Sequence, residues 1–174
     1  VWECPDLFKL PVDGGQEKWV MIVSIGDNGQ SAEGSRTQYF IGQFDGTTFV
    51  NDHDDSTILW LDYGRDNYAG VSWSDIQDGR RIYLGWMSNW RYANQVPTEV
   101  WRSAMTLPRE LSLAATEAGI RLFQQPVAEV SKIRKETDSF PNMSVESGNT
   151  VSIPLTHSLM EITIEFEKVN SSQF

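Results

Sequence analysis

Short apolar runs alternate with polar, turn-forming segments along most of the chain. Five of these runs are rich in β-branched and aromatic residues, as is typical of strands: residues 19–25, 37–44, 67–73, 81–87 and 102–107. Helical periodicity is almost absent, and only residues 125–135 have the spacing of helical turns. The pattern predicts an all-β protein.

Two Asp-Gly pairs, Asp45-Gly46 and Asp78-Gly79, each lie between two such runs. This dipeptide tolerates the positive φ angles that a tight hairpin turn requires, so each pair predicts an antiparallel hairpin. Repeated short strands with turn signals are typical of a β-propeller or a β-sandwich. No fixed sequence period is clear enough for blades to be counted.

The composition changes after Leu113. Tryptophan is absent beyond that residue, and Ser- and Asn-rich stretches separate further strand-like runs near residues 151–155 and 160–166. We therefore expect residues 1–112 to form one β domain and residues 113–135 to form a linker. Residues 136–174 are then expected to begin a second β domain.

Charge and aromatic content narrow the choice of partner. The 14 basic and 24 acidic side chains give a net charge of −10, which repels phosphate backbones and anionic lipid headgroups. No apolar stretch approaches the roughly 20 residues of a membrane span. Seven Trp, five Tyr and eight Phe suit either a β core or the apolar faces of sugar rings. We expect no nucleic acid and no membrane as partner, and a neutral polyol fits best.

The sequence has few residues in a spacing that could bind a metal ion. Its lone cysteine, Cys4, and its two histidines, His53 and His157, do not have zinc-site spacing. The acidic segment 51–55 lacks the glycine and the terminal glutamate of a calcium-binding loop, so a solvated loop is the preferred interpretation. We expect neither a metal nor another cofactor.

One glutamate is a candidate for acid chemistry. In Trp2-Glu3-Cys4-Pro5 the carboxyl lies between a tryptophan and a small apolar thiol, and Pro5 restricts the backbone that follows. Partial burial would disfavour the charged form, which suits a general acid. The alternative is a solvated surface group, which is the commoner case for a glutamate considered alone.

The segment Trp2-Glu3-Cys4-Pro5-Asp6-Leu7-Phe8 is similar to the glutamate-cysteine-proline motif that holds the acid/base carboxylate in family 32 of the glycoside hydrolases. Further motifs follow in the order that bacterial levanases and exo-inulinases show: residues 38–49 (QYFIGQFDGTTF), 62–69 (DYGRDNYA), 85–90 (GWMSNW), 96–98 (VPT), 101–105 (WRSAM) and 107–111 (LPREL). The resemblance extends from residue 1 to about residue 135 and is closest to the bacterial levanases.

This resemblance implies a five-bladed β-propeller followed by a β-sandwich. Residues 1–112 would supply about the third to the fifth blade, and residues 136–174 would begin the sandwich. It also implies hydrolysis of β-fructofuranosyl linkages in levan, inulin or sucrose with retention of configuration. That reaction uses two carboxyl groups about 5 to 5.5 Å apart and no cofactor. Glu3 matches the acid/base.

The family's nucleophile, an aspartate in an Asn-Asp-Pro-Asn-Gly motif, has no match. The same holds for the Arg-Asp-Pro motif whose aspartate steadies the transition state. Asn51-Asp52 and Arg65-Asp66 begin like these motifs but continue differently, and they follow the glutamate instead of preceding it. We therefore expect the 174 residues to be an internal fragment that is inactive by itself.

Three further residues are candidates for substrate binding. Asp62 and Arg65 match positions that face the leaving-group sugar in relatives, where an anion beside a cation suits hydroxyl groups. A surface ion pair between blades is the alternative for these two. Trp90 matches a tryptophan that lines the fructose pocket, and blade core is its alternative. The core interpretation fits Trp86 and Trp101 better.

Two other functions stay open. An incomplete propeller could act as an inactive fructan-binding or interaction module, and a transferase relative would pass fructose to a sugar acceptor instead of water. The resemblance implies an extracellular protein, because fructans are polymers outside the cell. Open blade edges also predict self-association.

Overall fold

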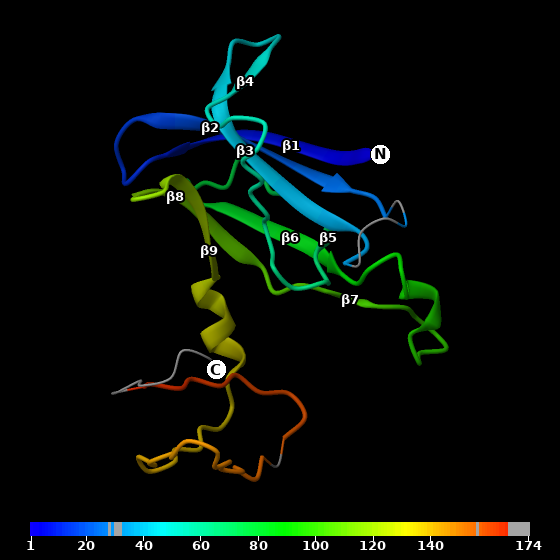
Figure 1. The fold of residues 1–174 in the computed structure, drawn as a ribbon, viewed down its shortest axis with the longest axis vertical. Coiled ribbons are helices and arrows are strands. Elements are labelled where there is room, and N and C mark those ends of the chain that lie inside the picture. Colours follow the sequence, from blue (N-terminus) through cyan, green and yellow to red (C-terminus); the bar gives the residue numbers. More distant parts are fainter. Residues whose placement is uncertain (28, 30–32, 156, 167–174) are drawn as a thin grey trace. The chain divides into compact units, whose positions relative to one another are not determined.

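The computed structural model describes residues 1–27, 29, 33–155 and 157–166 and is all-β, as the hydrophobic pattern predicts (Figure 1). Its strands are β1 (Trp2–Pro11), β2 (Glu17–Ile25), β3 (Arg36–Phe44), β4 (Phe49–Asn51), β5 (Tyr68–Ser72), β6 (Arg81–Met87), β7 (Ala104–Met105), β8 (Arg109–Thr116) and β9 (Gly119–Pro126). The described residues also contain two 3₁₀ helices, η1 (Ala93–Gln95) and η2 (Ala128–Ile133). The second of these confirms the helical turns expected in 125–135.

The first sheet is an antiparallel meander in the order β1-β2-β3-β4. Its inner face is apolar because alternate residues point the same way: Val20 pairs with Ile41, and Ile22 pairs with Tyr39. The hairpin predicted at Asp45 is confirmed as the turn between β3 and β4. There the Asp45 carboxylate accepts backbone N–H bonds from the next turn residues, at 2.8 and 2.7 Å.

The second sheet has the order β5-β6-β8-β9, and β7 pairs with β6. The hairpin predicted at Asp78-Gly79 is confirmed, because β5 and β6 are antiparallel neighbours. The strand expected at 102–107 shortens to β7. Sequence patterns missed β8 and β9, whose polar residues alternate with the buried Leu111, Leu113 and Leu122.

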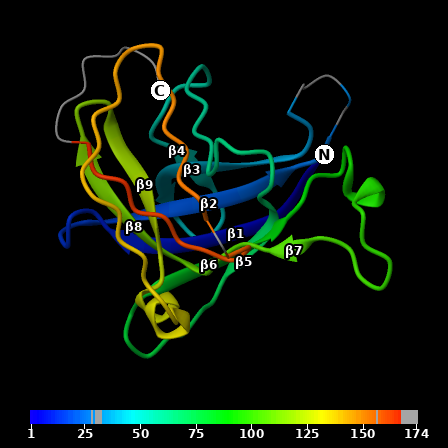
Figure 2. The same ribbon diagram turned by 90° about the horizontal axis from the view of Figure 1, so that it is seen from below.

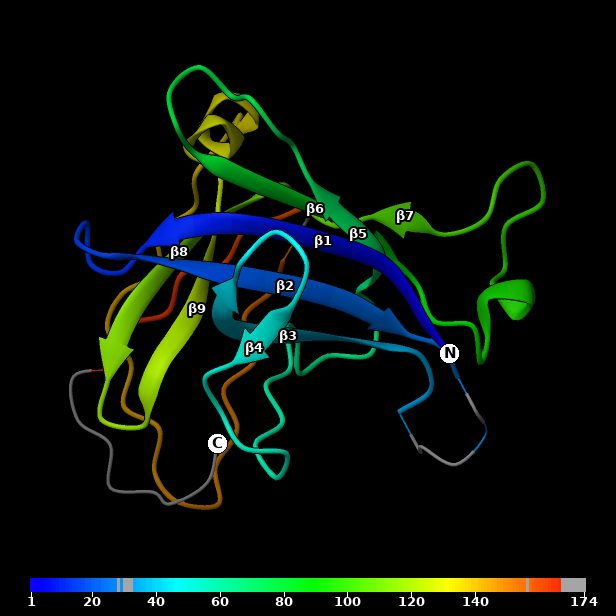
Figure 3. The same ribbon diagram turned by 90° about the horizontal axis from the view of Figure 1, so that it is seen from above.

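The two sheets share one core. Its buried residues come from both sheets and from the segment before β5: Phe8, Leu10, Val20, Ile22, Tyr39, Ile41, Leu59, Leu61, Tyr83, Leu111, Leu113 and Leu122. A parallel bridge between Val12 and Leu113 joins the sheets at one end. Figures 2 and 3 show that the excursion between β6 and β7 extends beyond the sheets on the side of the amino terminus.

The chain divides into two compact units, residues 1–134 and 135–174. The described residues of the second unit, 135–155 and 157–166, contain no helix or strand, so the strands expected near 151–155 and 160–166 are not found. A strand needs a hydrogen-bonded neighbour, and none lies among these residues. β8 and β9 extend ordered strands to Pro126, within the stretch expected to be a linker. The domain boundaries stay predictions.

Candidate active site

A β-bulge at the start of β1 determines how Glu3 is presented. The pairing of β1 with β2 shifts register between Glu3 and Asp6, and Cys4 in the bulge has a φ of 48°. A bulge re-aims the side chains around it, which is why bulges recur beside active sites. Trp2 is 62% exposed and Glu3 and Cys4 are exposed as well, so the expected burial of Glu3 by its neighbours is wrong. The bulge turns these side chains outward.

Tyr68 is the hydrogen-bond partner of Glu3. Its hydroxyl donates to Glu3 Oε2 from the first residue of β5, and its side chain is almost fully buried. Burial strongly raises the pKa of the Tyr68 hydroxyl, and the hydrogen bond to Glu3 raises it further. Tyr68 is therefore a neutral donor. Sequence analysis missed this residue, although it stands in the quoted segment 62–69.

A second bulge orients the side chain of Tyr68. The pairing of β5 with β6 is irregular between Tyr68 and Val71, and Ala69 has a φ of 50°. The Ala69 N–H donates a 2.9 Å hydrogen bond to the hydroxyl of Ser24, a fully buried residue of β2. The two facing bulges therefore bring the side chains of β1 and β5 together.

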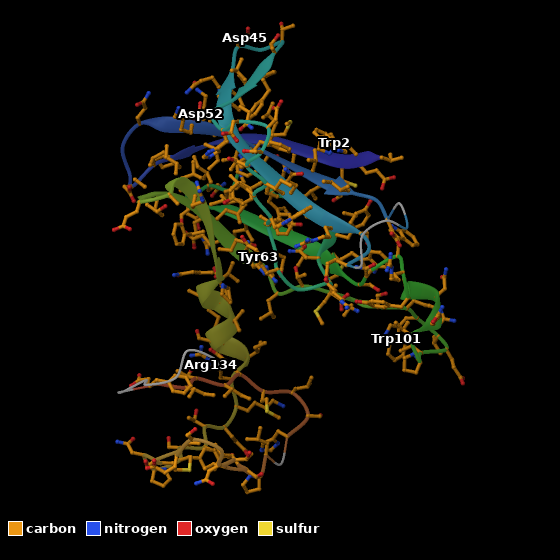
Figure 4. The ribbon with its side chains drawn as sticks, in the orientation of Figure 1. Trp2, Asp45, Asp52, Tyr63, Trp101 and Arg134 are labelled. Carbon is orange, nitrogen blue, oxygen red and sulfur yellow. The ribbon has the colours of Figure 1, made fainter. Side chains whose placement is uncertain are left out.

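A row of aromatic rings leads from Tyr68 to the segment 88–103 between β6 and β7. The Tyr68 and Trp86 ring centroids lie 6.4 Å apart, and those of Trp86 and Trp90 lie 4.9 Å apart. Trp90 is 54% exposed, so its blade-core interpretation is wrong, and Trp86 is half-buried. The core interpretation of Trp101 is also wrong, because this side chain is 65% exposed on the excursion (Figure 4).

Asp62 and Arg65 do not form the expected pair. Asp62 Oδ2 accepts a 2.8 Å hydrogen bond from Arg109 Nη1 and a 3.3 Å bond from Asn67, and its Oδ1 accepts a 2.8 Å bond from the Gly64 N–H. Burial raises the pKa of Asp62, but the Arg109 and Gly64 bonds outweigh it and hold that pKa below its usual range. Arg65 instead faces Glu33 at 3.5 Å.

A hollow of about 650 Å³ opens beside Asp62. The described residues that line it are Leu61, Asp62, Tyr63, Gly64, Met87, Thr106, Leu107, Arg109, Gln124 and Pro126. Glu3, Arg65 and Trp90 are not among them. The structure thus places Glu3 and Trp90 along the row of aromatic rings, and Asp62 in the lining of this hollow.

Asn89 connects the segments around Trp90. It is fully buried, and its side-chain N–H groups donate to the backbone carbonyls of Glu33, Ser35 and Arg65 at 2.7 to 3.1 Å. Its Oδ1 accepts the Ser35 and Arg91 N–H groups at 3.2 and 3.1 Å. Sequence analysis did not single out Asn89, and its only signal was a polar residue inside the motif 85–90.

In the part of the chain that the structure describes, no group of three or more His, Cys, Asp or Glu side chains could hold a metal ion. Within the same residues, no helix has the length and apolar character that crossing a membrane requires.

Comparison with known sequences shows where the chain belongs. The model of the glycosyl hydrolases family 32 N-terminal domain matches residues 1–126. A levanase of Bacillus subtilis (strain 168) is 52% identical over 172 residues, which are 96% of this chain and 25% of the levanase. An extracellular exo-inulinase of Aspergillus niger is 46% identical over 133 residues, 72% of this chain and 25% of that protein. The chain thus spans about a quarter of the length of these relatives.

Solved structures agree with the sequence matches. The match to an exo-inulinase from Aspergillus awamori has a TM-score of 0.67 and 42% sequence identity, and it covers 75% of this chain and 27% of the exo-inulinase chain. The match to a β-fructofuranosidase from Schwanniomyces occidentalis complexed with fructosyl-erythritol has a TM-score of 0.65 and 39% identity. It covers 75% of this chain and 26% of that chain. The N-terminal domains of this family are five-bladed β-propellers, which confirms the fold class. The described residues form two sheets, whereas the third to the fifth blade would be three, and the place of the chain within the propeller stays a prediction. The chain belongs to family 32 of the glycosyl hydrolases.

Proposed function

We propose that this chain is part of a β-fructosidase that cleaves β-fructofuranosyl linkages in levan, inulin or sucrose, with Glu3 as its acid/base. The observation that carries the proposal is the exposed Glu3 carboxyl, which a bulge presents and Tyr68 holds at one oxygen. The names of the relatives, a levanase and an exo-inulinase, support the same chemistry.

The reaction follows from the roles of two carboxyl groups. A carboxylate nucleophile outside these 174 residues attacks the anomeric carbon while protonated Glu3 gives its proton to the departing glycosidic oxygen. Glu3, now a carboxylate, then takes a proton from the water that releases fructose from the nucleophile. Because the acid/base and the nucleophile must act together, we expect the 174 residues alone to release no fructose.

Substrate contacts complete the proposal. The exposed ring of Trp90 would cover the apolar face of a fructose unit. Asp62 would bind hydroxyl groups of the leaving-group sugar, with Arg109 beside it in place of the expected Arg65. Arg65 is proposed to contact the sugar from the loop where it faces Glu33. Secretion is part of the proposal, because relatives include an extracellular exo-inulinase.

The test compares two variants of the full-length protein. Glu3→Gln should lower kcat on levan, inulin or sucrose by about 10²- to 10⁴-fold, because an unactivated leaving group needs a proton. It should lower kcat/KM much less on an aryl β-fructofuranoside, whose phenolate departs without one. Glu117→Gln, at an exposed position between β8 and β9, should match the wild type. Wild-type hydrolysis of levan by Glu3→Gln would overturn the proposal.

A fructan-binding module is the second candidate, favoured by the exposed rings of Trp90 and Trp101. It predicts that levan in an affinity gel slows the migration of the full-length wild-type protein, which nevertheless releases no fructose from levan. Slowed migration together with fructose release supports the hydrolase instead. Self-association through the unpaired edges of β1 and β4 stays a prediction, which sedimentation velocity checks.

A further inference from the structure

The two oxygens of the Glu3 carboxyl have different surroundings. Oε2 accepts the hydroxyl of Tyr68, whereas Oε1 has no hydrogen-bond partner among the residues that the structure describes. We propose that Tyr68 is a positioning residue for proton transfer, which holds Oε2 as an acceptor and leaves Oε1 to carry the transferable proton. This inference rests on the proposed role of Glu3 as the acid/base.

Tyr68 can keep this role throughout the reaction because it stays protonated. Its side chain is 2% exposed, and burial raises the pKa of its hydroxyl well above the usual value. The titratable groups that interact with this hydroxyl are Glu3 and Cys4, and both favour its neutral form. Asp6, further along β1, is occupied by the N–H and hydroxyl of Ser72, at 2.7 and 2.6 Å. A neutral phenol that donates to Oε2 leaves that oxygen unable to act as the acid.

The surrounding backbone holds the pair in place. Ser24 accepts the Ala69 N–H and thereby fixes the bulge that follows Tyr68. The Trp86 ring packs edge-on against the Tyr68 ring. Gly26 lies on another side, where a Cβ would be 3.5 Å from the Tyr68 hydroxyl and 3.7 Å from Glu3 Oε2. These contacts restrict the tyrosine, and through it the rotation of the carboxyl group.

The hydrogen bond from Tyr68 fixes the rotation of the Glu3 carboxyl group. Without the hydroxyl, Oε1 is less well aligned with the glycosidic oxygen when it gives its proton, and with the water when it takes one.

The experiment uses the full-length protein and a matched pair of hydroxyl deletions. Tyr68→Phe keeps the ring and should lower kcat/KM on sucrose about tenfold. The loss of kcat/KM should be smaller on an aryl β-fructofuranoside, whose phenolate departs without a proton from Glu3. Tyr39→Phe is the control, because Tyr39 is equally buried but its hydroxyl accepts the Leu122 N–H in the core. It should lower stability and leave kcat/KM on both substrates unchanged.

The outcomes separate this inference from the proposed function. If Glu3→Gln abolishes sucrose hydrolysis while folded Tyr68→Phe keeps the wild-type kcat/KM on both substrates, Tyr68 has no positioning role and the assignment of Glu3 stands. If Glu3→Gln hydrolyses sucrose normally, both fall. Should Tyr68→Phe not fold, Ser24→Ala removes the bond to Ala69 and must lower kcat/KM on sucrose more than on the aryl β-fructofuranoside. An unchanged kcat/KM on sucrose in folded Ser24→Ala would then overturn the inference.

Discussion

Arg109, the first residue of β8, donates a 2.8 Å hydrogen bond to Asp62, which precedes β5. Both side chains are about three-quarters buried, with exposed fractions of 25% and 24%. Removing one member of such a pair leaves a largely buried charge without its partner, which destabilises a protein far more than losing an exposed pair. The pair therefore stabilises the junction between the two sheets and orders the hollow proposed to bind sugar.

Asp62→Asn tests this pair through pH. Because the pKa of Asp62 is held below its usual range in the folded state, the carboxylate stabilises the fold above the unfolded pKa of about 3.9, and this contribution is lost as the pH falls through the folded pKa. We expect Asp62→Asn to lower the free energy of unfolding by about 1–3 kcal/mol at pH 7. The difference should shrink below about pH 4. Urea unfolding at both pH values measures it.

Glu17→Gln is the matched control for that measurement. Its partner Lys9 lies at 3.5 Å, and both side chains are about half exposed. An exposed pair of this kind contributes about 0–1 kcal/mol, so the variant should differ little from the wild type at either pH. An effect of Asp62→Asn that is no larger than that of Glu17→Gln would contradict the stabilising role of the buried pair.

Asn89→Ala should be among the more damaging substitutions outside the apolar core. The side chain is fully buried, and its amide makes five hydrogen bonds to backbone groups, so truncation leaves several buried polar groups unsatisfied. We expect the free energy of unfolding to fall by about 2–4 kcal/mol. Asn94→Ala, at an exposed position in η1, should change it by less than about 0.5 kcal/mol. Equal effects of the two variants in urea unfolding would be inconsistent with this role.

Gly70→Ala should destabilise the second sheet. A Cβ on Gly70 would lie 2.0 Å from the Tyr83 hydroxyl oxygen and 2.2 Å from Cζ, and this ring is fully buried. Such overpacking costs about 1–3 kcal/mol because neither the ring nor the strand can move freely. Gly15→Ala is the control, since its Cβ would meet only the Val12 carbonyl, at 3.3 Å. Thermal unfolding should show a clearly lower Tm for Gly70→Ala alone.

Trp90→Ala should weaken substrate binding more than folding. The ring is 54% exposed, so its removal costs little core packing, whereas a sugar face that stacks on it loses about 1 kcal/mol or more. We expect KM for inulin to rise about tenfold with little change in kcat. The matched control is Trp73, which directly follows β5 and has a ring of similar exposure. Trp73→Ala should leave KM unchanged. A normal KM in Trp90→Ala would remove this residue from the binding site.

The all-β class and the two hairpins could be predicted from sequence because their signals are local. β-branched and aromatic runs favour strands, and an Asp-Gly pair supplies the positive φ that Gly46 and Gly79 adopt at 99° and 78°. The ordered motifs also identified the family, and the acid/base role of Glu3 that they indicate stays a prediction. β8 and β9 were missed because they contain few of the β-branched and aromatic residues that marked the other strands, although their buried residues face the core between the two sheets.

The partners of the site residues depended on tertiary structure alone. Asp62 and Arg65 are three positions apart, but they lie in a loop, where no helical turn brings such residues to one face. The charged partner of Asp62 stands 47 positions away, and the hydroxyl partner of Glu3 stands 65 positions away. Sequence determines which residues can form strands and turns through short-range preferences. Which side chains meet is decided by the way one sheet packs on the other, because that packing brings distant bulges and strand ends together.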